Sequence, residues 1–263
     1  MATSSPKTRL DIALVERGLV ETRQKAQALI LAGKVLVNKQ KVSKAGAAVA
    51  LDSVVELIAP PMPYVGRGGL KMAAALDHWQ IDPGGWVALD IGSSTGGFTD
   101  CLLQRGAARA IAVDAGTNQL DWRLRNNPRV RVLENTNARY LTFEQIGEQV
   151  DIVVIDVSFI SVKRILPVLP AFCKDGTQLL VLVKPQFEAG RGQVGKGGIV
   201  RDEAMRVAVV ESVRQAVFAE GFCHLDHIAC PVLGAEGNQE YLLHGIFVRS
   251  APLTTAATPA IER

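Results

Sequence analysis

The sequence lacks long apolar runs, paired cysteines and an apolar leader. No uncharged stretch reaches the roughly 18 residues that a membrane-spanning helix needs. The first residues, Met-Ala-Thr-Ser-Ser-Pro-Lys-Thr, are polar and do not resemble a signal peptide. The four cysteines form no C-x-x-C motif, which argues against a disulfide framework or a zinc ribbon. We therefore expect a cytoplasmic protein without stable membrane insertion.

One cluster of cysteine and histidine, in residues 223–230, has the residue types of a metal site. The segment also has the composition of a β-strand, in which residues an even number apart share a face. Cys223 and His227 would then point to one side, and His224 and Cys230 to the other. We therefore predict ordinary strand residues here and no metal.

The composition itself is that of a folded protein, with 48% hydrophobic and 21% charged residues among 263. That length suggests two domains. Charge also divides the chain: residues 1–71 carry eleven lysines and arginines against five acids, and the rest carries eighteen against twenty-one. A front part of net charge +6 before a back part of −3 is typical of a chain that meets RNA, DNA, phosphate or an anionic membrane.

Residues 9–58 read as a small unit of two short helices followed by short β segments. Apolar residues at helical spacing run from Leu10 to a glycine stop at Gly18. Thr22 can cap a second helix, which Gly33 ends. A unit of this size has only a small core.

The motifs of this unit resemble those of the S-four RNA-binding domain, named after a ribosomal protein. The likeness rests on Arg9-Leu10-Asp11, on Thr22 to Ala26 and on Ala32 to Asn38. It implies that the cationic side chains of the unit face RNA, although any one of them alone would also fit a solvated surface charge. With one arginine of the following linker, the expected RNA contacts are Arg9, Arg23, Lys25, Lys34, Lys39, Lys41 and Arg67.

A stretch rich in proline and glycine, residues 59–69, marks a linker. Beyond it β and α patterns alternate, as in a doubly wound parallel sheet with helices on both faces. We therefore predict an α/β fold, with a Rossmann-like doubly wound sheet in residues 70–249 behind a small N-terminal α+β RNA-binding domain. Residues 1–8 and the small, polar tail 250–263 are expected to be disordered.

A glycine-rich loop follows the predicted strand that ends at Ile91. Such a loop is typical of a nucleotide cofactor at the carboxyl edge of a sheet. The dinucleotide pattern G-x-G-x-x-G fails at Ser94, whereas an acid followed by G-x-x-x-G-G resembles the first motif of S-adenosylmethionine methyltransferases. Asp114 ends the next strand, where a carboxylate can bind both ribose hydroxyls. The alternative is a tight turn in some other α/β protein.

A second glycine pattern, Gly190 followed by Gly195-Lys196, meets most of a phosphate-binding loop. It fails at Gly197, where Ser or Thr must bind magnesium, and it does not follow a strand directly. We therefore interpret residues 190–198 as a mobile, glycine-hinged loop over the site.

Two lysines and two acids stand near predicted element ends. Lys71 opens the helix after the linker, and Glu240 precedes a late strand. Asp156 and Lys184 each end a strand, and such ends converge on one edge of a doubly wound sheet. Taken in chain order, the four resemble the Lys-Asp-Lys-Glu tetrad of FtsJ-like ribose 2′-O-methyltransferases. A ribose hydroxyl is a very weak acid, and a lysine beside a sulfonium, which disfavours the charged amine, can serve as its base.

Over residues 9–248 the chain resembles the TlyA family, ribosomal RNA cytidine 2′-O-methyltransferases that are sometimes labelled hemolysins. The likeness adds Arg67 to Lys71, Asp90 to Asp100, Asp156 to Ser161 and Val183 to Glu188. It implies S-adenosylmethionine as cofactor, ribosomal RNA in ribosomal subunits as partner, and catalytic roles for Lys71, Asp156, Lys184 and Glu240. Where many methyltransferases place an acid near the adenine, this chain has asparagine. The residues expected at the cofactor are Asp90, Gly92, Ser93, Gly96, Gly97, Phe98, Asp114, Asn137 and Asp156.

Two other functions remain open at this point. A membrane-active hemolysin would need an amphipathic or spanning segment, which the sequence does not show. An RNA-binding protein with an inert methyltransferase fold is opposed by the intact tetrad. A pseudouridine synthase with the same front domain is excluded, because such an enzyme has no use for the cofactor loop.

Overall fold

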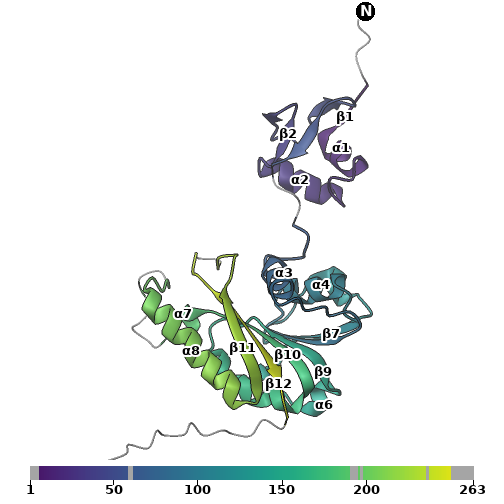
Figure 1. Ribbon diagram of the computed structural model, residues 1–263. Helices are drawn as coiled ribbons and strands as arrows, with labels where there is room; N and C mark the ends of the chain where they lie inside the picture. Colours follow the sequence, from purple (N-terminus) through teal and green to yellow (C-terminus); the bar gives the residue numbers. More distant parts are fainter. Residues whose placement is uncertain (1–5, 59–61, 190–194, 196–197, 235–236, 250–263) are drawn as a thin grey trace, which may run out of the picture. The chain divides into compact units, whose positions relative to one another are not determined.

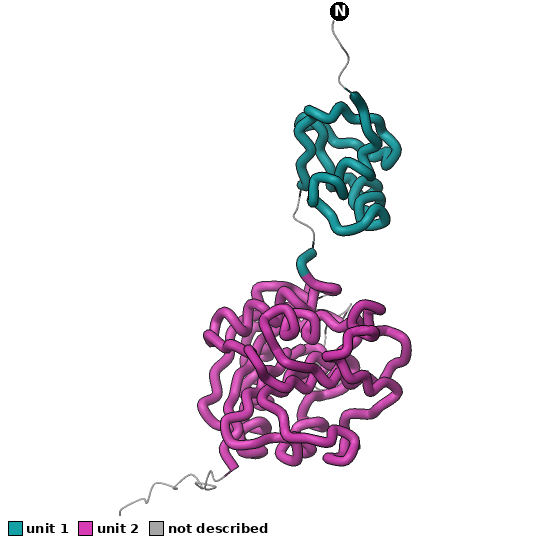
Figure 2. Tube along the Cα trace, turned by 90° about the vertical axis from the view of Figure 1, so that its right-hand side faces the viewer, with its two compact units in different colours: residues 1–63 teal, residues 64–263 magenta. Residues whose placement is uncertain are grey.

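The computed structural model describes residues 6–58, 62–189, 195, 198–234 and 237–249. The chain divides into two compact units, residues 1–63 and 64–263 (Figure 2). Strand β1 (Lys7–Arg9) begins inside the segment expected to be disordered, and helix α3 (Gly68–His78) begins inside the expected linker. The expected tail, residues 250–263, lies outside the described residues.

The smaller unit combines two helices with a two-stranded and a three-stranded antiparallel sheet. Thr22 caps the second helix as predicted, because its Oγ1 accepts a hydrogen bond from the Lys25 amide at 3.2 Å. Leu14 and Ile30 of the helices pack with Val35 of the sheet in a small buried core. Besides β1, the elements are α1 (Leu10–Glu16), α2 (Arg23–Leu31), β2 (Val35–Val37), β3 (Gln40–Lys41), β4 (Ala48–Ala50) and β5 (Val55–Leu57).

The larger unit is built on a seven-stranded sheet in the order β11-β12-β10-β9-β6-β7-β8 (Figure 1). Strands β6 to β10 run parallel, as predicted for a doubly wound sheet. The last two strands run the other way, since β12 is antiparallel to β10 and β11 is antiparallel to β12, so the sheet is mostly parallel. The strands are β6 (Val87–Ile91), β7 (Arg109–Val113), β8 (Val130–Leu133), β9 (Val150–Ile155), β10 (Cys173–Val183), β11 (Phe222–Ala229) and β12 (Tyr241–Phe247).

Both faces of this sheet are covered by helices (Figure 1). Alternation along β6 places Leu89 and Ile91 in one core cluster and Ala88 in the other. Helix α8 (Glu203–Ala219) packs on the first face. On the second face pack α3, α4 (Gly97–Gln104) and α5 (Trp122–Arg125). Short helical segments are η1 (Ala138–Tyr140), α6 (Phe143–Ile146), η2 (Val162–Arg164), η3 (Leu166–Ala171) and α7 (Pro185–Glu188).

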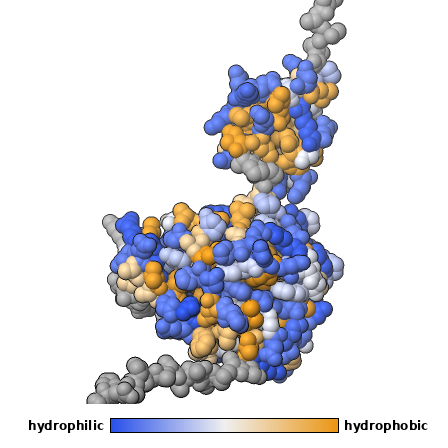
Figure 3. Space-filling view, viewed as in Figure 1, coloured by the Kyte–Doolittle hydropathy of each residue, from blue (hydrophilic) through white to orange (hydrophobic). Residues whose placement is uncertain are grey.

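The surface differs between the units. In the view of Figure 3 the larger unit is mostly hydrophilic, whereas the smaller unit gathers apolar side chains on this face. The most exposed large apolar side chains of the smaller unit are Leu31 and Val54, at 73% and 57% exposure. No helix within the described ranges is long and apolar enough to cross a membrane.

Candidate active site

Most of the predicted site residues meet at the carboxyl edge of the parallel strands. Strands β6, β7, β9 and β10 end at this edge and are followed at once by a predicted site residue each, which are Gly92, Asp114, Asp156 and Lys184. The doubly wound topology therefore brings together residues that lie far apart in the chain.

A cavity of about 500 Å³ opens at this edge between the ends of β6, β7 and β9. Asp114 lines it and accepts hydrogen bonds from the amides of Ser94 and Gly116, both at 2.7 Å. Asn137 also lines it, and its side-chain oxygen accepts a hydrogen bond from the Arg139 amide at 3.2 Å. The predicted adenine contact therefore borders the cavity, with its oxygen engaged in a local turn.

A second cavity of about 230 Å³ adjoins the first. The two share four lining residues, among them Gly92 and Asp156. Lys184 lines only the second cavity, and the predicted cofactor residues that join it there are Ser93, Gly97 and Phe98. The pair of cavities forms one continuous cleft that leads from Asp114 to Lys184.

Two glycines of the loop have different structural reasons. Gly92 has a φ of +84°, and a Cβ there would lie 2.4 Å from the Asp156 carbonyl oxygen, so the loop can only pass this close without a side chain. Gly96 has a φ of +93°, but a Cβ there would meet Leu124 at 2.3 Å in the core. Among the described residues Gly96 lines neither cavity, and its predicted cofactor contact stays a prediction.

Asp90, the acid before the loop, does not reach the cleft either. Its side chain is fully buried, and Oδ2 accepts hydrogen bonds from the Thr99 amide at 3.0 Å and the Thr99 hydroxyl at 2.6 Å. Burial raises the pKa of this carboxyl to about 7. Asp90 thus holds the first turn of α4, whose N-terminal residues line the cleft, and its predicted contact with the cofactor stays a prediction.

The four tetrad residues form two lysine–acid pairs. Lys184 Nζ lies 2.6 Å from Asp156 Oδ1 and 2.8 Å from the Ser158 hydroxyl, on the lining of the second cavity. Lys71 Nζ lies 2.5 Å from Glu240 Oε2. Glu240 reaches the carboxyl edge because β12 is antiparallel, so the residue before its first position lies beside the ends of the parallel strands.

The second pair lies deeper than the first. Lys71 and Glu240 are 8% and 3% exposed and, among the described residues, line neither cavity. Cys230 lies next to the second pair, because its amide donates a hydrogen bond to the Glu240 carbonyl at 2.8 Å. Burial raises the pKa of this thiol. The tetrad is thus a partly buried pair on the cleft lining and a buried pair beside it.

One aromatic side chain at the cleft was missed by the sequence analysis. Phe159 lines the first cavity, is 91% exposed and has a φ of +65°. Its ring packs at 5.1 Å on that of Phe187. Positive φ is uncommon for a bulky residue and clusters at functional sites. From sequence alone, a phenylalanine just after a buried strand looks like a core residue, so no signal marked it.

In the smaller unit, two predicted RNA contacts converge on a buried acid that was also missed. Both oxygens of Asp11 accept hydrogen bonds from Arg9 at 3.0 Å, and Oδ2 accepts a further one from Arg23 at 2.8 Å. Gln27 donates to the same Oδ2 at 2.9 Å. The Arg9 guanidinium, above all, holds the pKa of Asp11 well below its usual range. Asp11 therefore orients two half-exposed arginines on the surface.

The remaining predicted RNA contacts are less constrained. Lys25 lies 3.6 Å from Glu21 one helical turn away. Arg67 belongs to the larger unit and donates a hydrogen bond to the Leu233 carbonyl at 3.0 Å. The other three predicted cations are exposed: Lys34, Lys39 and Lys41.

The cysteine and histidine segment is a strand, as predicted, but an irregular one. Its register shifts between Cys223 and Asp226, where His224 has a φ of +51°. The alternation of faces assumed from sequence does not continue through this bulge. The described part of the chain contains no group of three or more His, Cys, Asp or Glu that could hold a metal.

The glycine loop at 190–198, predicted to be mobile, lies mostly outside the described residues. Its described end is held by Asn238, which donates a hydrogen bond to the Gly198 carbonyl at 2.9 Å and accepts one from the Val200 amide at 3.1 Å.

Comparison with known proteins agrees with this architecture. The FtsJ-like methyltransferase family matches residues 64–247, and the S4 domain matches residues 8–55. The 16S/23S rRNA (cytidine-2'-O)-methyltransferase TlyA of Mycobacterium tuberculosis is 44% identical over 238 residues, which cover 90% of this chain and 89% of that protein. Hemolysin A of Brachyspira hyodysenteriae is 40% identical over 239 residues, which cover 90% of this chain and 99% of that protein.

Solved structures give the same result. A candidate hemolysin from Streptococcus thermophilus is 41% identical, with a TM-score of 0.70 over 93% of this chain and 90% of its own. These matches confirm the resemblance drawn from the sequence motifs. The chain therefore belongs to the TlyA family, FtsJ-like methyltransferases that carry an N-terminal S4 domain.

Proposed function

We propose that this protein transfers the methyl group of S-adenosylmethionine to the 2′-hydroxyl of a cytidine in ribosomal RNA, within ribosomal subunits in the cytoplasm. The observation that carries the proposal is the Lys184–Asp156 pair, 2.6 Å apart on the lining of a cleft that also contains the glycine-rich loop. Relatives at 40–44% identity include one named for this reaction.

The cleft suits the cofactor in size and chemistry. Its larger part, about 500 Å³, falls within the range of about 300–1,000 Å³ typical of ligand pockets. Asp114 at one end offers a carboxylate to a ribose, while the bare backbone at Gly92 permits close approach to the amino-acid part. When bound there, S-adenosylmethionine supplies an electrophilic methyl group beside a positive sulfur.

The residues of the tetrad divide the remaining work. Lys184 takes the proton of the ribose hydroxyl with its neutral amine, the form that a positive sulfur nearby favours. Asp156 and Ser158 fix the position of this amine through contacts of 2.6 and 2.8 Å. Lys71 and Glu240 act from behind as positioning residues, since they line neither cavity among the described residues. Their ion pair ties α3 to the start of β12 and so fixes the edge on which the first pair stands.

Phe159 provides an aromatic surface in the cleft on which a nucleotide base can stack. RNA bases that leave their stack are held by aromatic side chains. An exposed ring at the first cavity, braced by Phe187, offers such a surface. We propose that it stacks on the base whose ribose is methylated.

The smaller unit binds the RNA through its cationic side chains. Arg9 and Arg23 are about half exposed, at 49% and 53%, and both are oriented by Asp11. Fixed guanidinium groups bind phosphate with two parallel hydrogen bonds.

The proposal is tested by incubating the protein with labelled S-adenosylmethionine and with unmodified small or large ribosomal subunits, then mapping any ribose methyl. Lys184→Ala should abolish transfer while the cofactor still binds. Lys174→Ala is the matched control, because Lys174 pairs with Asp151 at 2.5 Å at the opposite ends of the same two strands. Equal loss in both variants, or none in Lys184→Ala, would reject the assignment. Binding of cofactor without transfer to either subunit would reject this substrate.

A further inference from the structure

The two units differ completely in aromatic content. All fourteen aromatic residues, eight Phe, three Tyr and three Trp, lie beyond residue 63. Proteins that hold single-stranded RNA combine cationic grooves with rings on which bases stack. Because the smaller unit has no aromatic residue, any stacking of a base on an aromatic ring must come from the larger unit.

Trp122 has an exposed indole ring on which a base could stack. It is 71% exposed, whereas Trp79 and Trp86 are both partly buried. A tryptophan is costly to leave in water unless something covers it. Trp122 is the first residue of α5, which is a single helical turn and is the next element after strand β7.

The turn that carries Trp122 is fixed to the cleft. The Asp121 amide donates a hydrogen bond to the Thr95 carbonyl at 3.1 Å, and Thr95 lines the second cavity. Leu124, which is 4% exposed, packs into the space left by the missing side chain of Gly96. The indole therefore stands in a defined place, one residue from a direct contact with the glycine-rich loop.

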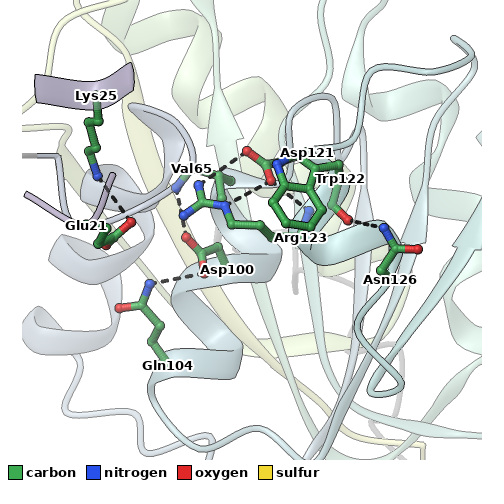
Figure 4. Close-up of polar contacts among 9 residues, drawn as sticks. All are labelled: Glu21, Lys25, Val65, Asp100, Gln104, Asp121, Trp122, Arg123 and Asn126. Atoms are coloured by element: carbon green, nitrogen blue, oxygen red, sulfur yellow. Dashed lines mark hydrogen bonds and ion pairs between the residues drawn. The ribbon is translucent and has the colours of Figure 1, made fainter. Parts of the chain in front are cut away.

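A cationic side chain accompanies the ring. The Arg123 guanidinium is turned toward Asp121, with Nε 3.1 Å from Oδ1, and is 47% exposed (Figure 4). The side-chain amide of Asn126 donates a hydrogen bond to the Trp122 carbonyl at 2.8 Å and closes the turn (Figure 4). An oriented arginine next to an exposed indole has the chemistry of an RNA contact rather than that of an apolar protein interface.

We propose that Trp122 stacks on a base of the substrate strand beside the methylated nucleotide, with Arg123 contacting the adjoining phosphate. The inference rests on the proposed function and adds a second stacking position to that of Phe159. Phe159 lines the first cavity, and Trp122 directly follows Asp121, whose amide donates a hydrogen bond to Thr95 of the second. The two cavities share four lining residues.

Tryptophan fluorescence tests this contact directly. A short single-stranded oligocytidylate should quench the emission of the full-length protein, and Trp122→Phe should remove most of that quenching while binding persists. Trp86→Phe is the matched control and should leave the quenching in place. Quenching that is unchanged in Trp122→Phe, or absent from the wild-type protein, overturns the inference.

Affinity provides the second measurement. Trp122→Ala should bind unmodified ribosomal subunits about 5- to 150-fold more weakly, the range expected for one lost base stack. Arg123→Gln should weaken binding less, and Arg109→Gln is its matched control, because Arg109 pairs with Glu148 at the start of β7, the end away from the cleft. Full affinity in Trp122→Ala overturns the inference.

Two outcomes separate this inference from neighbouring ones. If the wild-type protein transfers methyl groups to subunits and Trp122→Ala does so with unchanged KM, only the Trp122 contact is lost and the proposed function stands. If the wild-type protein neither transfers methyl groups nor binds subunits, both fail. If sedimentation shows a dimer that Trp122→Ala converts to a monomer, the indole serves a second copy of the chain and the RNA contact is rejected.

Discussion

Among the described residues each unit has one fully buried carboxylate, and the surroundings of the two shift the pKa in opposite directions. In the smaller unit Asp11 receives hydrogen bonds from Arg9 and Arg23, and the first of these guanidinium groups lowers its pKa most. In the larger unit Asp90 receives hydrogen bonds from the amide and hydroxyl of Thr99, and burial raises its pKa to about 7. Asp11 therefore orients two arginine side chains at the surface, whereas Asp90 holds the backbone of the first turn of α4.

The same division runs through the rest of the molecule. The smaller unit has cations but no aromatic ring, so it can hold RNA only through its charges and its backbone. The larger unit has the rings, the cleft and two lysine–acid pairs. We therefore expect substitutions of the smaller unit's cations to weaken RNA binding without changing the residues of the cleft.

Removal of Glu240 should have the largest effect on stability. Glu240→Ala leaves the Lys71 amine, 8% exposed, without its partner in a buried site. An uncompensated buried charge costs about 3–5 kcal/mol of unfolding free energy. Urea denaturation followed by tryptophan fluorescence measures the larger unit selectively, because all three tryptophans lie in it.

The control is Glu148→Ala, which breaks the exposed pair with Arg109. Exposed pairs contribute only about 0–1 kcal/mol. Similar costs in the two variants would contradict the distinction between a buried and a surface pair.

The pH dependence of the larger unit should show the effect of Asp90. Its pKa in the folded state, about 7, lies above the ordinary value of 3.8, so between these values the folded state retains a proton that the unfolded state releases. Unfolding free energy should fall as pH rises from about 4 to about 7, by at most about 4 kcal/mol. Asp90→Asn should flatten this part of the profile in fluorescence-monitored urea titrations, and parallel profiles would contradict the assignment.

Loss of Asp11 should have a moderate effect on the smaller unit. Asp11→Ala removes the acceptor of hydrogen bonds from Arg9, Arg23 and Gln27, at a cost of about 1–3 kcal/mol. Amide hydrogen exchange in α1 and α2 measures it, since the unit has no fluorescent ring. Glu56→Ala, an exposed position of the same unit, should leave the exchange rates unchanged. Equal exchange rates in the two variants would show that Asp11 does not hold the unit together.

The smallest expected effect concerns salt. Arg23→Gln should reduce the slope of log binding constant against log salt by about one unit, because one phosphate contact is lost. Arg17 is the control, since its guanidinium donates to the Ser53 and Leu51 carbonyls at 2.6 and 2.9 Å and is occupied within the unit. If Arg17→Gln changed the slope as much as Arg23→Gln, the predicted RNA surface would be wrong.

The sequence predicted what depends on local pattern. The cap at Thr22 and the alternation of strands and helices follow from side-chain chemistry and spacing, and both are confirmed. The placement of Gly92, Asp114, Asp156 and Lys184 at one edge follows from the parallel topology. Such features can be read from sequence because neighbouring residues or fixed fold rules determine them.

What the sequence did not predict depends on tertiary contacts. Asp90 and Gly96 stand in the right motif, yet Thr99 and Leu124 turn them toward the core. Asp11 is an ordinary first-turn acid until the second helix packs beside it. The exposure of Phe159 depends on a left-handed backbone that no residue type near it requires.

The most direct test of the division between the units is methyl transfer measured against the concentration of unmodified ribosomal subunits. Our account predicts that Arg23→Gln raises the concentration for half-maximal rate and leaves the maximal rate near that of the wild type. Lys184→Ala should lower the maximal rate about 100-fold or more, the contribution expected of a positioned base, with binding of subunits retained. An unchanged maximal rate in Lys184→Ala, or a maximal rate lost in Arg23→Gln, would contradict the account.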